Sequence, residues 1–209
     1  EPQQRGKFMN NTTGTSSTAG KFASAFALGA ELFSTRNVVY SDTLIKKAIS
    51  SFFFGTEKIG VSQTASVRSP YIYAEENWAD DFELAIVQMC NMEKDWLKRN
   101  PNTQIINHSS FDLIQSSFEF AKQEPLTPWL GTDTAKHYQW YPFINIGHYE
   151  LAKQLKDKRR DTIVGYYKEG LERVWDKAKQ NAFYRGVPFI WCSNNLTTSF
   201  AIQCYWYKE

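Results

Sequence analysis

The clearest alternation of apolar and polar positions in the sequence begins at Asn77. Apolar side chains recur after it at steps of four and three residues, which is the spacing of one helical face. The positions on this face are Trp78, Phe82, Ala85, Met89, Met92 and Trp96. Asn77 can cap the helix, and Asp80 falls in its first turn, where a carboxylate complements the unpaired N–H groups. The pattern therefore predicts a helix with a well-defined start.

Six further segments show helical spacing, and no segment shows a convincing strand pattern. Caps, glycines and prolines mark their limits. We expect these helices from Ser17; from a cap at Asp42 to an end at Gly55; from Ser109 or Ser110 to just before Pro125; from Pro142 to about Lys156; from Asp161; and from before Leu196 to the end of the chain. About seven helices result, so the sequence predicts an all-α fold of stacked helical hairpins whose long loops gather at one end.

The composition is that of a chain that can bury a core. Of the 209 residues, 42% are hydrophobic and 16% are aromatic. Most rings belong in the core, but an exposed minority on a concave surface would suit stacking on the flat apolar faces of sugars. The formal net charge is +2, with nearly equal numbers of acids and bases, which gives no electrostatic case for nucleic acid. No apolar run is long enough to span a bilayer.

Three cysteines, Cys90, Cys192 and Cys204, cannot form a fully paired disulfide framework. Cys192 and Cys204 also fall within one predicted helix, where they would be too far apart to bridge. We therefore expect the cysteines to be buried thiols.

Two pairs of adjacent polar side chains are candidates for a functional site. Asp80 and Asp81 could be a catalytic or metal-binding carboxylate pair, or they could simply mark a helix start, where acids are common. Asn194 and Asn195 could hydrogen-bond a polyol, or one of them could cap the last helix. The local sequence alone favours the helix-start role for the acids and the cap role for one of the amides.

Four aromatic residues of the long loops are candidates for sugar stacking. Trp140 and Trp191 each stand just before a predicted helix, where an indole can be either a lid on the core or a stacking platform for a ligand. Tyr71 and Tyr73 alternate in an extended segment, so one of them is expected to face a ligand and the other the core. The sequence contains no two-histidine metal motif, glycine-rich phosphate loop or nucleophile elbow.

Four blocks of the sequence resemble the catalytic domain of glycoside hydrolase family nine, the cellulase family that includes endoglucanases. The blocks are STAGKFASAFALG (residues 17–29), NWADDFELA (77–85), FINIGHYELAK (143–153) and GVPFIWCSNN (186–195). They stand in order across nearly the whole chain, which makes the set more specific than any one block. The resemblance implies an (α/α)6 barrel of helical hairpins. It identifies residues 1–209 as a single partial catalytic domain, the central part of a longer helical barrel.

The resemblance also implies where the reacting carboxylates belong. In the family, the general base stands in an Asp-Ala-Gly-Asp type motif before the first block, and the general acid is a glutamate well after the last. Neither motif occurs in this chain, and Asp80 and Asp81 match neither. We therefore assign no catalytic residue and expect both carboxylates in the remainder of the catalytic domain. The intact protein is expected to cleave β-1,4-glucan, a cellulose-like polysaccharide, with inversion at the anomeric carbon.

A structural calcium ion is the role that the resemblance implies for the two acids. In family nine this ion commonly sits where the matching helix begins, and hard oxygen ligands hold it. Carried over to this chain, the ligands are Asp80, Asp81 and Asn145, with main-chain oxygens near Glu76 and Asn77. The alternative for Asn145 is a plain hydrogen bond at a helix start.

The same resemblance places Trp140 and Trp191 along the sugar cleft, with Tyr71 or Tyr73 near another cleft aromatic. Asn195 lies where other members carry an arginine that touches the glucan. Because polymeric glucan is extracellular, the protein is expected to be secreted, periplasmic or bound at the cell surface. A second hypothesis is a non-catalytic helical protein that uses the same scaffold to bind a glycan or a protein partner.

Overall fold

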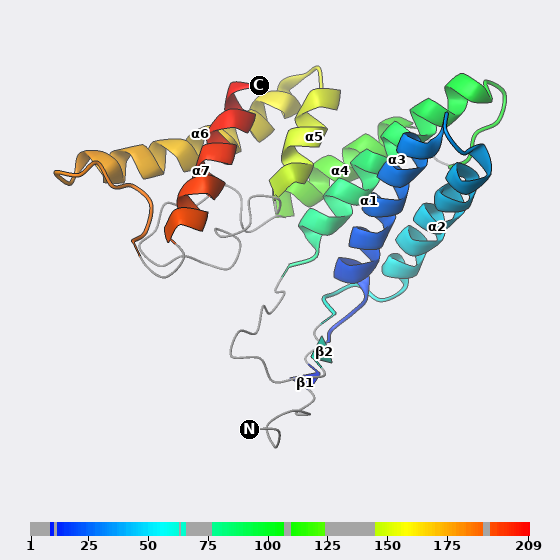
Figure 1. The fold of residues 1–209 in the computed structure, drawn as a ribbon, viewed down its shortest axis with the longest axis horizontal. Helices are drawn as coiled ribbons and strands as arrows, with labels where there is room; N and C mark the ends of the chain where they lie inside the picture. Colours follow the sequence, from blue (N-terminus) through cyan, green and yellow to red (C-terminus); the bar gives the residue numbers. More distant parts are fainter. Residues whose placement is uncertain are drawn as a thin grey trace. The chain divides into compact units, whose positions relative to one another are not determined.

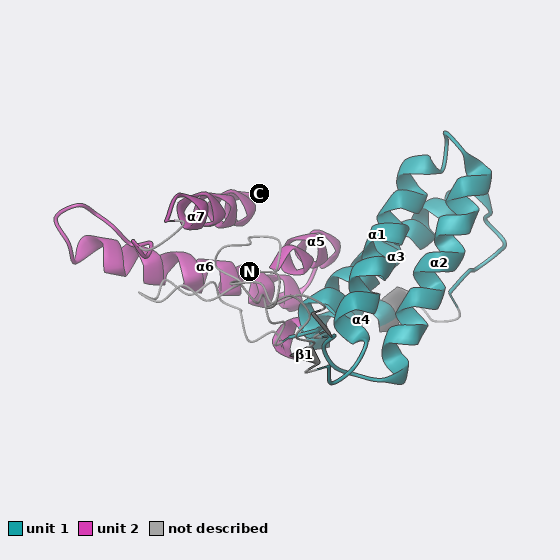
Figure 2. Cartoon of the chain, turned by 60° about the horizontal axis from the view of Figure 1, so that its bottom comes forward, with its two compact units in different colours: residues 1–120 teal, residues 121–209 magenta. Residues whose placement is uncertain are grey.

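The computed structural model describes residues 9–10, 12–62, 64–65, 77–106, 110–123, 145–189 and 193–209. Within these ranges the regular structure is almost entirely helical, as the sequence predicts (Figure 1). In chain order the elements are β1 (Met9–Asn10), α1 (Ser16–Phe33), α2 (Val38–Glu57), β2 (Thr64–Ala65), α3 (Ala79–Arg99), α4 (Ser110–Gln123), α5 (Ile146–Gln154), α6 (Lys158–Lys179) and α7 (Ser193–Lys208). The short strands β1 and β2 pair antiparallel. The chain forms two compact units, Glu1–Phe120 and Ala121–Glu209 (Figure 2).

In the first unit, α1 packs along both α2 and α3 (Figure 1). Its contact surface consists of small side chains, and Ala23 and Ala27 are completely buried. A Cβ atom added at Gly20 would lie 2.9 Å from the Cβ atom of Asp81 in α3. The small residues of α1 therefore let the helix backbones approach closely.

The core of the first unit is built mainly on α3. The apolar face that the sequence predicts for this helix is the face that it buries: Phe82, Ala85, Met89 and Met92 are each at most 1% exposed. Apolar side chains of α2 and α4 pack against α3. These include Leu44, Ile45, Ala48 and Leu113. The periodicity alone thus identified the side of α3 that faces its neighbours.

Cys90 of α3 lies in the same core. Burial raises the pKa of its thiol to about 12, because desolvation disfavours the thiolate. Cys204 of α7 is exposed. The prediction of buried thiols is therefore right for Cys90 and wrong for Cys204, and Cys192 lies outside the described residues.

In the second unit a buried polar network joins α5, α6 and α7. Asn145, directly before α5, donates from Nδ2 to Oε1 of Gln203 at 2.7 Å, and Gln203 Nε2 donates back to Asn145 Oδ1 at 3.0 Å. The hydroxyl of Tyr167 in α6 donates to the main-chain oxygen of Asn145 at 2.6 Å. All three residues are buried. The network therefore connects three helices while it satisfies polar atoms that water cannot reach.

Both ends of α2 differ from the expected ones. The cap is Asn37, whose side chain accepts a hydrogen bond from a first-turn N–H at 3.0 Å, so Asp42 lies inside the helix. Gly55 does not end the helix either. A Cβ atom there would lie 2.9 Å from side-chain atoms of Ala19 and Phe82, so the glycine makes room for a close helix contact.

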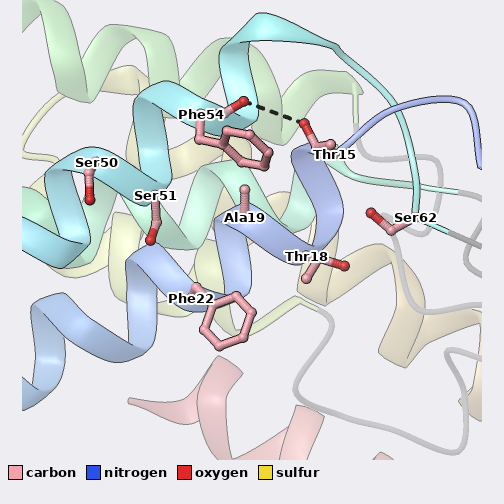
Figure 3. A pocket seen from close by; sticks show the side chains of 8 residues that line it. All are labelled: Thr15, Thr18, Ala19, Phe22, Ser50, Ser51, Phe54 and Ser62. Carbon is pink, nitrogen blue, oxygen red and sulfur yellow. Dashed lines mark hydrogen bonds between the residues drawn. The ribbon is translucent and has the colours of Figure 1, made fainter.

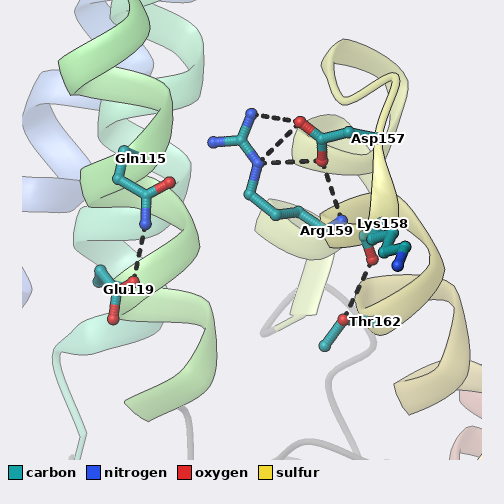
Figure 4. Close-up of polar contacts among 6 residues, drawn as sticks. All are labelled: Gln115, Glu119, Asp157, Lys158, Arg159 and Thr162. Carbon is teal, nitrogen blue, oxygen red and sulfur yellow. Dashed lines mark hydrogen bonds and ion pairs between the residues drawn. The ribbon is translucent and has the colours of Figure 1, made fainter.

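The start of α6 also lies earlier than expected, at Lys158 instead of Asp161. Asp157 caps this helix. Its Oδ1 accepts from the N–H of Arg159 at 2.9 Å and its Oδ2 from the Arg159 guanidinium at 2.6 Å (Figure 4). Hydrogen bonding from the Arg159 side chain, and then from its N–H, holds the pKa of the Asp157 carboxyl below its usual range. The negative cap offsets the basic side chains of the first turn, which oppose the helix dipole.

Candidate functional site

The first turn of α3 is the best-defined candidate site in the described structure. The Asn77 side chain accepts a hydrogen bond from the N–H of Ala79 at 3.1 Å, although the cap position itself is occupied by Trp78. Asp80 and Asp81 follow in that turn, where the N–H groups of the helix start favour negative charge. The predicted helix start is therefore confirmed, with Asn77 supporting it from one residue before the cap.

Asp81 has a cationic partner on another helix. Its side chain is 10% exposed, and Oδ2 lies 2.6 Å from the ammonium of Lys21 in α1. Oδ1 of Asp80 is also buried. A buried carboxylate without a countercharge would be destabilising, so the Lys21 ammonium stabilises the contact between α1 and α3. It already supplies one positive charge where the resemblance implies a calcium ion.

The third implied ligand, Asn145, belongs to the second unit and has a structural role there. Its amide group exchanges two hydrogen bonds with Gln203. It occupies the cap position of α5, but its side chain makes no capping hydrogen bond to that helix. Asn145 is thus a hydrogen bonder at a helix start, as the alternative has it, with Gln203 of α7 as its partner.

The donor atoms at the start of α3 fit calcium chemically, because carboxylate and amide oxygens are its preferred ligands. Within the described ranges, no group of three or more His, Cys, Asp or Glu side chains is placed to hold a metal ion. A calcium ion at Asp80 and Asp81 would therefore also need main-chain oxygens or water. Glu76 lies outside the described residues. The calcium site stays a prediction.

Of the predicted cleft residues, the structure describes the two amides. The four aromatic candidates lie outside the described ranges, and their role stays a prediction. They are Trp140, Trp191, Tyr71 and Tyr73. Because α7 begins at Ser193, Asn194 and Asn195 lie inside its first turn and not at its cap. Both are exposed, a position from which their side chains can reach a ligand.

A surface pocket of about 480 Å³ lies between the start of α1 and the second half of α2 (Figure 3). The residues that line it are Thr15, Thr18, Ala19, Phe22, Ser50, Ser51, Phe54 and Ser62. The Thr15 hydroxyl donates to the main-chain oxygen of Phe54 at 3.4 Å. No carboxylate, imidazole or thiol is among these lining residues. This pocket therefore lacks the groups that acid–base hydrolysis needs.

The partners of Asp81 and Asn145 could not be predicted from the local sequence. Lys21 pairs with Asp81 across 60 positions of the chain, and Gln203 pairs with Asn145 across 58. Neither pairing leaves a spacing signal, because each depends on how two helices cross. The one signal available was indirect: Lys21 lies in the same family-like block as the small residues of α1.

The family of the chain is decided by its whole sequence. Residues 1–209 match the family model described as glycosyl hydrolase family 9. The chain belongs to glycosyl hydrolase family 9. Members of family 9 fold as an (α/α)6 barrel, which accords with the seven helices in the described ranges. No curated protein and no solved structure matches the chain.

Membership of family 9 relates the chain to glycoside hydrolases of the cellulase type. It agrees with the resemblance seen in the four sequence blocks, of which NWADDFELA contains the first turn of α3. In the part of the chain that the structure describes, no helix is long and apolar enough to cross a membrane.

Proposed function

We propose that the intact family 9 protein hydrolyses β-1,4-glucan, with a cellulose-like polysaccharide as its substrate. The observation that carries this proposal is the match of the family model over residues 1–209. The aromatic content of the sequence supports it, since 16% of the residues are Phe, Trp or Tyr. Rings in such numbers can supply both a core and a sugar-stacking surface.

In this proposal the chain holds the glucan and both reacting carboxylates come from outside it. The side chains that would contact the sugar are Trp140, Trp191, Asn194, Asn195 and one of the pair Tyr71 and Tyr73. The rings would stack on the apolar faces of the pyranose units, and the amides would hydrogen-bond their hydroxyl groups. Inversion requires a base that activates water and an acid that protonates the leaving oxygen, about 6.5–9.5 Å apart. Without these two groups, the chain by itself should bind glucan and leave it intact.

The experiment that tests this function is a binding measurement paired with a hydrolysis assay. Cellohexaose titrated into the purified chain in a calorimeter should bind, while carboxymethylcellulose should release no new reducing ends. Trp140→Ala and Trp191→Ala should each weaken binding by roughly 2- to 10-fold through loss of one stacked ring. Tyr205→Ala removes an exposed ring of α7 and serves as the control.

Three outcomes would contradict the proposal. Release of reducing ends by the chain would show that it carries its own acid and base. Unchanged affinity in both tryptophan variants would remove their stacking role. Binding of a β-1,3-glucan in place of cellohexaose would show that the substrate class is wrong.

We further propose that the first turn of α3 binds a structural calcium ion through Asp80 and Asp81. Two adjacent carboxylates at a helix start support this, and one oxygen of each is buried or ion-paired. When bound, the ion would neutralise charge that the Lys21 ammonium now balances at Asp81. Calcium and Lys21 should therefore compete for Asp81. Asn145, the third ligand that the resemblance implies, has its amide group bonded to Gln203 within the second unit.

Polymeric glucan does not enter cells, so we propose that the intact protein acts outside the cytoplasm, as a secreted, periplasmic or surface-bound enzyme. Fractionation of the producing cells tests this, and recovery of the protein from the cytoplasm alone would contradict it.

A further inference from the structure

The loop that follows α6, drawn in orange in Figure 1, carries several rings that are exposed to solvent. Trp175, in the last part of α6, is 55% exposed, and Tyr184 is 67% exposed. Two more rings on the same segment, Phe183 and Phe189, are 92% and 75% exposed. Burial of large aromatic side chains is a main source of folding stability, so several exposed rings on one segment mark a surface that another group covers.

A network of hydrogen bonds fixes this segment without using the rings. Oδ1 of Asn181 accepts from the N–H groups of Phe183 at 3.2 Å and Arg185 at 3.0 Å. Nδ2 of Asn181 donates to the main-chain oxygen of Arg185 at 2.8 Å. One side chain thus closes the turn from both directions. The Asn181 side chain therefore holds the turn, and none of these hydrogen bonds uses an aromatic ring.

The turn folds back onto α6 and brings Tyr184 against Trp175. A Cβ atom at Gly186 would lie 2.2 Å from the main-chain oxygen of Val174, so the backbone passes directly over the helix there. The ring centroids of Trp175 and Tyr184 are 6.3 Å apart with an interplanar angle of 24°. We call this stacked pair the aromatic platform. Each of its rings has one face turned to the other ring, and more than half of the surface of each residue is exposed.

Tyr184 adopts a backbone conformation that residues other than glycine rarely adopt. Its φ is 51°, in the left-handed region, which is sterically unfavourable for a residue other than glycine. Such strain persists where surrounding structure enforces it, often at sites of function. Glycine would avoid the strain, but it would also remove the ring that stacks on Trp175.

Charged groups stand among the rings of this segment. The Lys179 ammonium lies 5.9 Å from the centre of the Trp175 ring and 2.7 Å from the Asp176 carboxylate. The Arg185 guanidinium lies 6.0 Å from the centre of the Phe189 ring. A protein helix docking here would have to desolvate these charges, which is unfavourable. A pyranose unit fits better, because it stacks through an apolar face and offers hydroxyl groups to charged neighbours.

We propose that the aromatic platform, Trp175 with Tyr184, is a second carbohydrate-binding surface for a polymeric β-glucan, built from residues other than those of the proposed function. The class of its ligand rests on that proposed function. The location of the surface rests on the exposed rings, the Asn181 turn and the backbone of Tyr184. Its role is to keep polymer close to the protein, so short oligosaccharides that fill the cleft do not need it.

The experiment is native gel electrophoresis of the full 209-residue chain through gels that contain soluble hydroxyethylcellulose. Polymer binding retards the protein, and the retardation gives a dissociation constant. Trp175→Ala and Tyr184→Gly should each weaken polymer binding by about 3- to 10-fold, the effect of one lost stacking ring. Tyr205→Ala removes a ring of similar exposure, 56%, from α7 and should leave the retardation unchanged.

Tyr184→Gly separates binding from folding. It removes the ring and also relieves the strained φ, so its melting temperature should not fall. Tyr184→Trp restores a ring at the same position and should restore polymer binding. Retardation equal to that of the unsubstituted chain in both Tyr184→Gly and Trp175→Ala would overturn the platform.

Calorimetry with cellohexaose distinguishes failure of the platform from failure of the proposed function. The platform variants should bind cellohexaose with the affinity of the unsubstituted chain. Trp140→Ala and Trp191→Ala should bind it more weakly. Loss of cellohexaose binding in the platform variants would show that these rings belong to the cleft and would overturn a second surface. An unsubstituted chain that binds neither polymer nor oligosaccharide would overturn the proposed function, and the glucan assignment of the platform with it.

Discussion

At the scale of single residues, the first unit depends on side chains that are small or absent where its helices touch. Gly20 of α1 lies against Asp81 of α3, and Gly55 of α2 lies against Ala19 and Phe82. At each position an added methyl group would meet atoms at 2.9 Å, closer than carbon atoms approach without displacement. Glycine in a helix is otherwise unfavourable by about 0.5–1 kcal/mol relative to alanine, so its presence here reflects packing.

Alanine substitutions at two glycines should therefore have opposite effects. Gly20→Ala should lower the free energy of unfolding by about 1–3 kcal/mol, since its Cβ would press on the backbone of α3. Gly165→Ala, in α6, meets nothing within 4 Å and should raise stability by about 0.5–1 kcal/mol through helix propensity alone. Urea denaturation of both variants measures the difference. A stabilised Gly20→Ala would show that α1 and α3 are less tightly packed than the structure has them.

At the scale of elements, the periodicity of apolar residues predicted each helix but not each boundary. Within the described ranges, the number of helices and the buried face of α3 were confirmed. The start of α2 was wrong because the cap is Asn37, five positions before the expected Asp42. Both residue types can cap a helix, so residue type alone does not select between the two positions. The predicted end of α2 was wrong because the prediction treated Gly55 as an end signal. In the structure Gly55 lies inside the helix and allows close packing. The difference depends on what the neighbouring helix brings to Gly55, which local sequence does not contain.

The cap of α6 gives a pH-dependent test. The pKa of Asp157 is lowered from its ordinary value of 3.8 by hydrogen bonding to Arg159, so the folded state favours the ionised carboxylate. Its stabilising effect should be complete above that ordinary value and should disappear as the pH falls through the lower folded-state pKa.

Asp157→Asn keeps a capping oxygen but removes the charge, and Asp157→Ala removes both. At pH 7 the melting temperatures should fall in the order unsubstituted, Asp157→Asn, Asp157→Ala. The difference between the unsubstituted chain and Asp157→Asn should shrink toward pH 3. A difference that is constant between pH 7 and pH 3 would show that the ionised carboxylate does not stabilise the cap.

At the scale of the whole molecule, the decisive polar contacts join residues that are distant in sequence. Lys21 meets Asp81 across 60 positions, and Asn145 meets Gln203 across 58. The local sequence indicated that Asp80 and Asp81 were a candidate site, and the family resemblance implied a metal role for them together with Asn145. The sequence could not show that Asp81 and Asn145 each have a protein partner, because those partners are set by helix crossings.

The competition between Lys21 and calcium can be measured by thermal unfolding. Added calcium should raise the melting temperature over that in chelator, because an ion that binds the folded state stabilises it. Lys21→Met removes the competing ammonium. It should lower stability in chelator and increase the response to calcium.

Asp81→Asn should abolish the response to calcium, whereas Asp161→Asn, in the first turn of α6, should retain it. An identical melting temperature in calcium and in chelator, for both the unsubstituted chain and Lys21→Met, would exclude the ion. The chain would then rely on the ammonium of Lys21 as its countercharge.

The buried thiol of Cys90 has a consequence for the chemical durability of the chain. Thiol oxidation and alkylation proceed through the thiolate. With a pKa of about 12, on the order of one Cys90 side chain in 10⁵ is ionised at pH 7. Oxidants and alkylating reagents should therefore spare Cys90 for as long as the helices around it stay closed, even in an oxidising environment. The rate at which Cys90 is modified would then measure how often the first unit opens transiently.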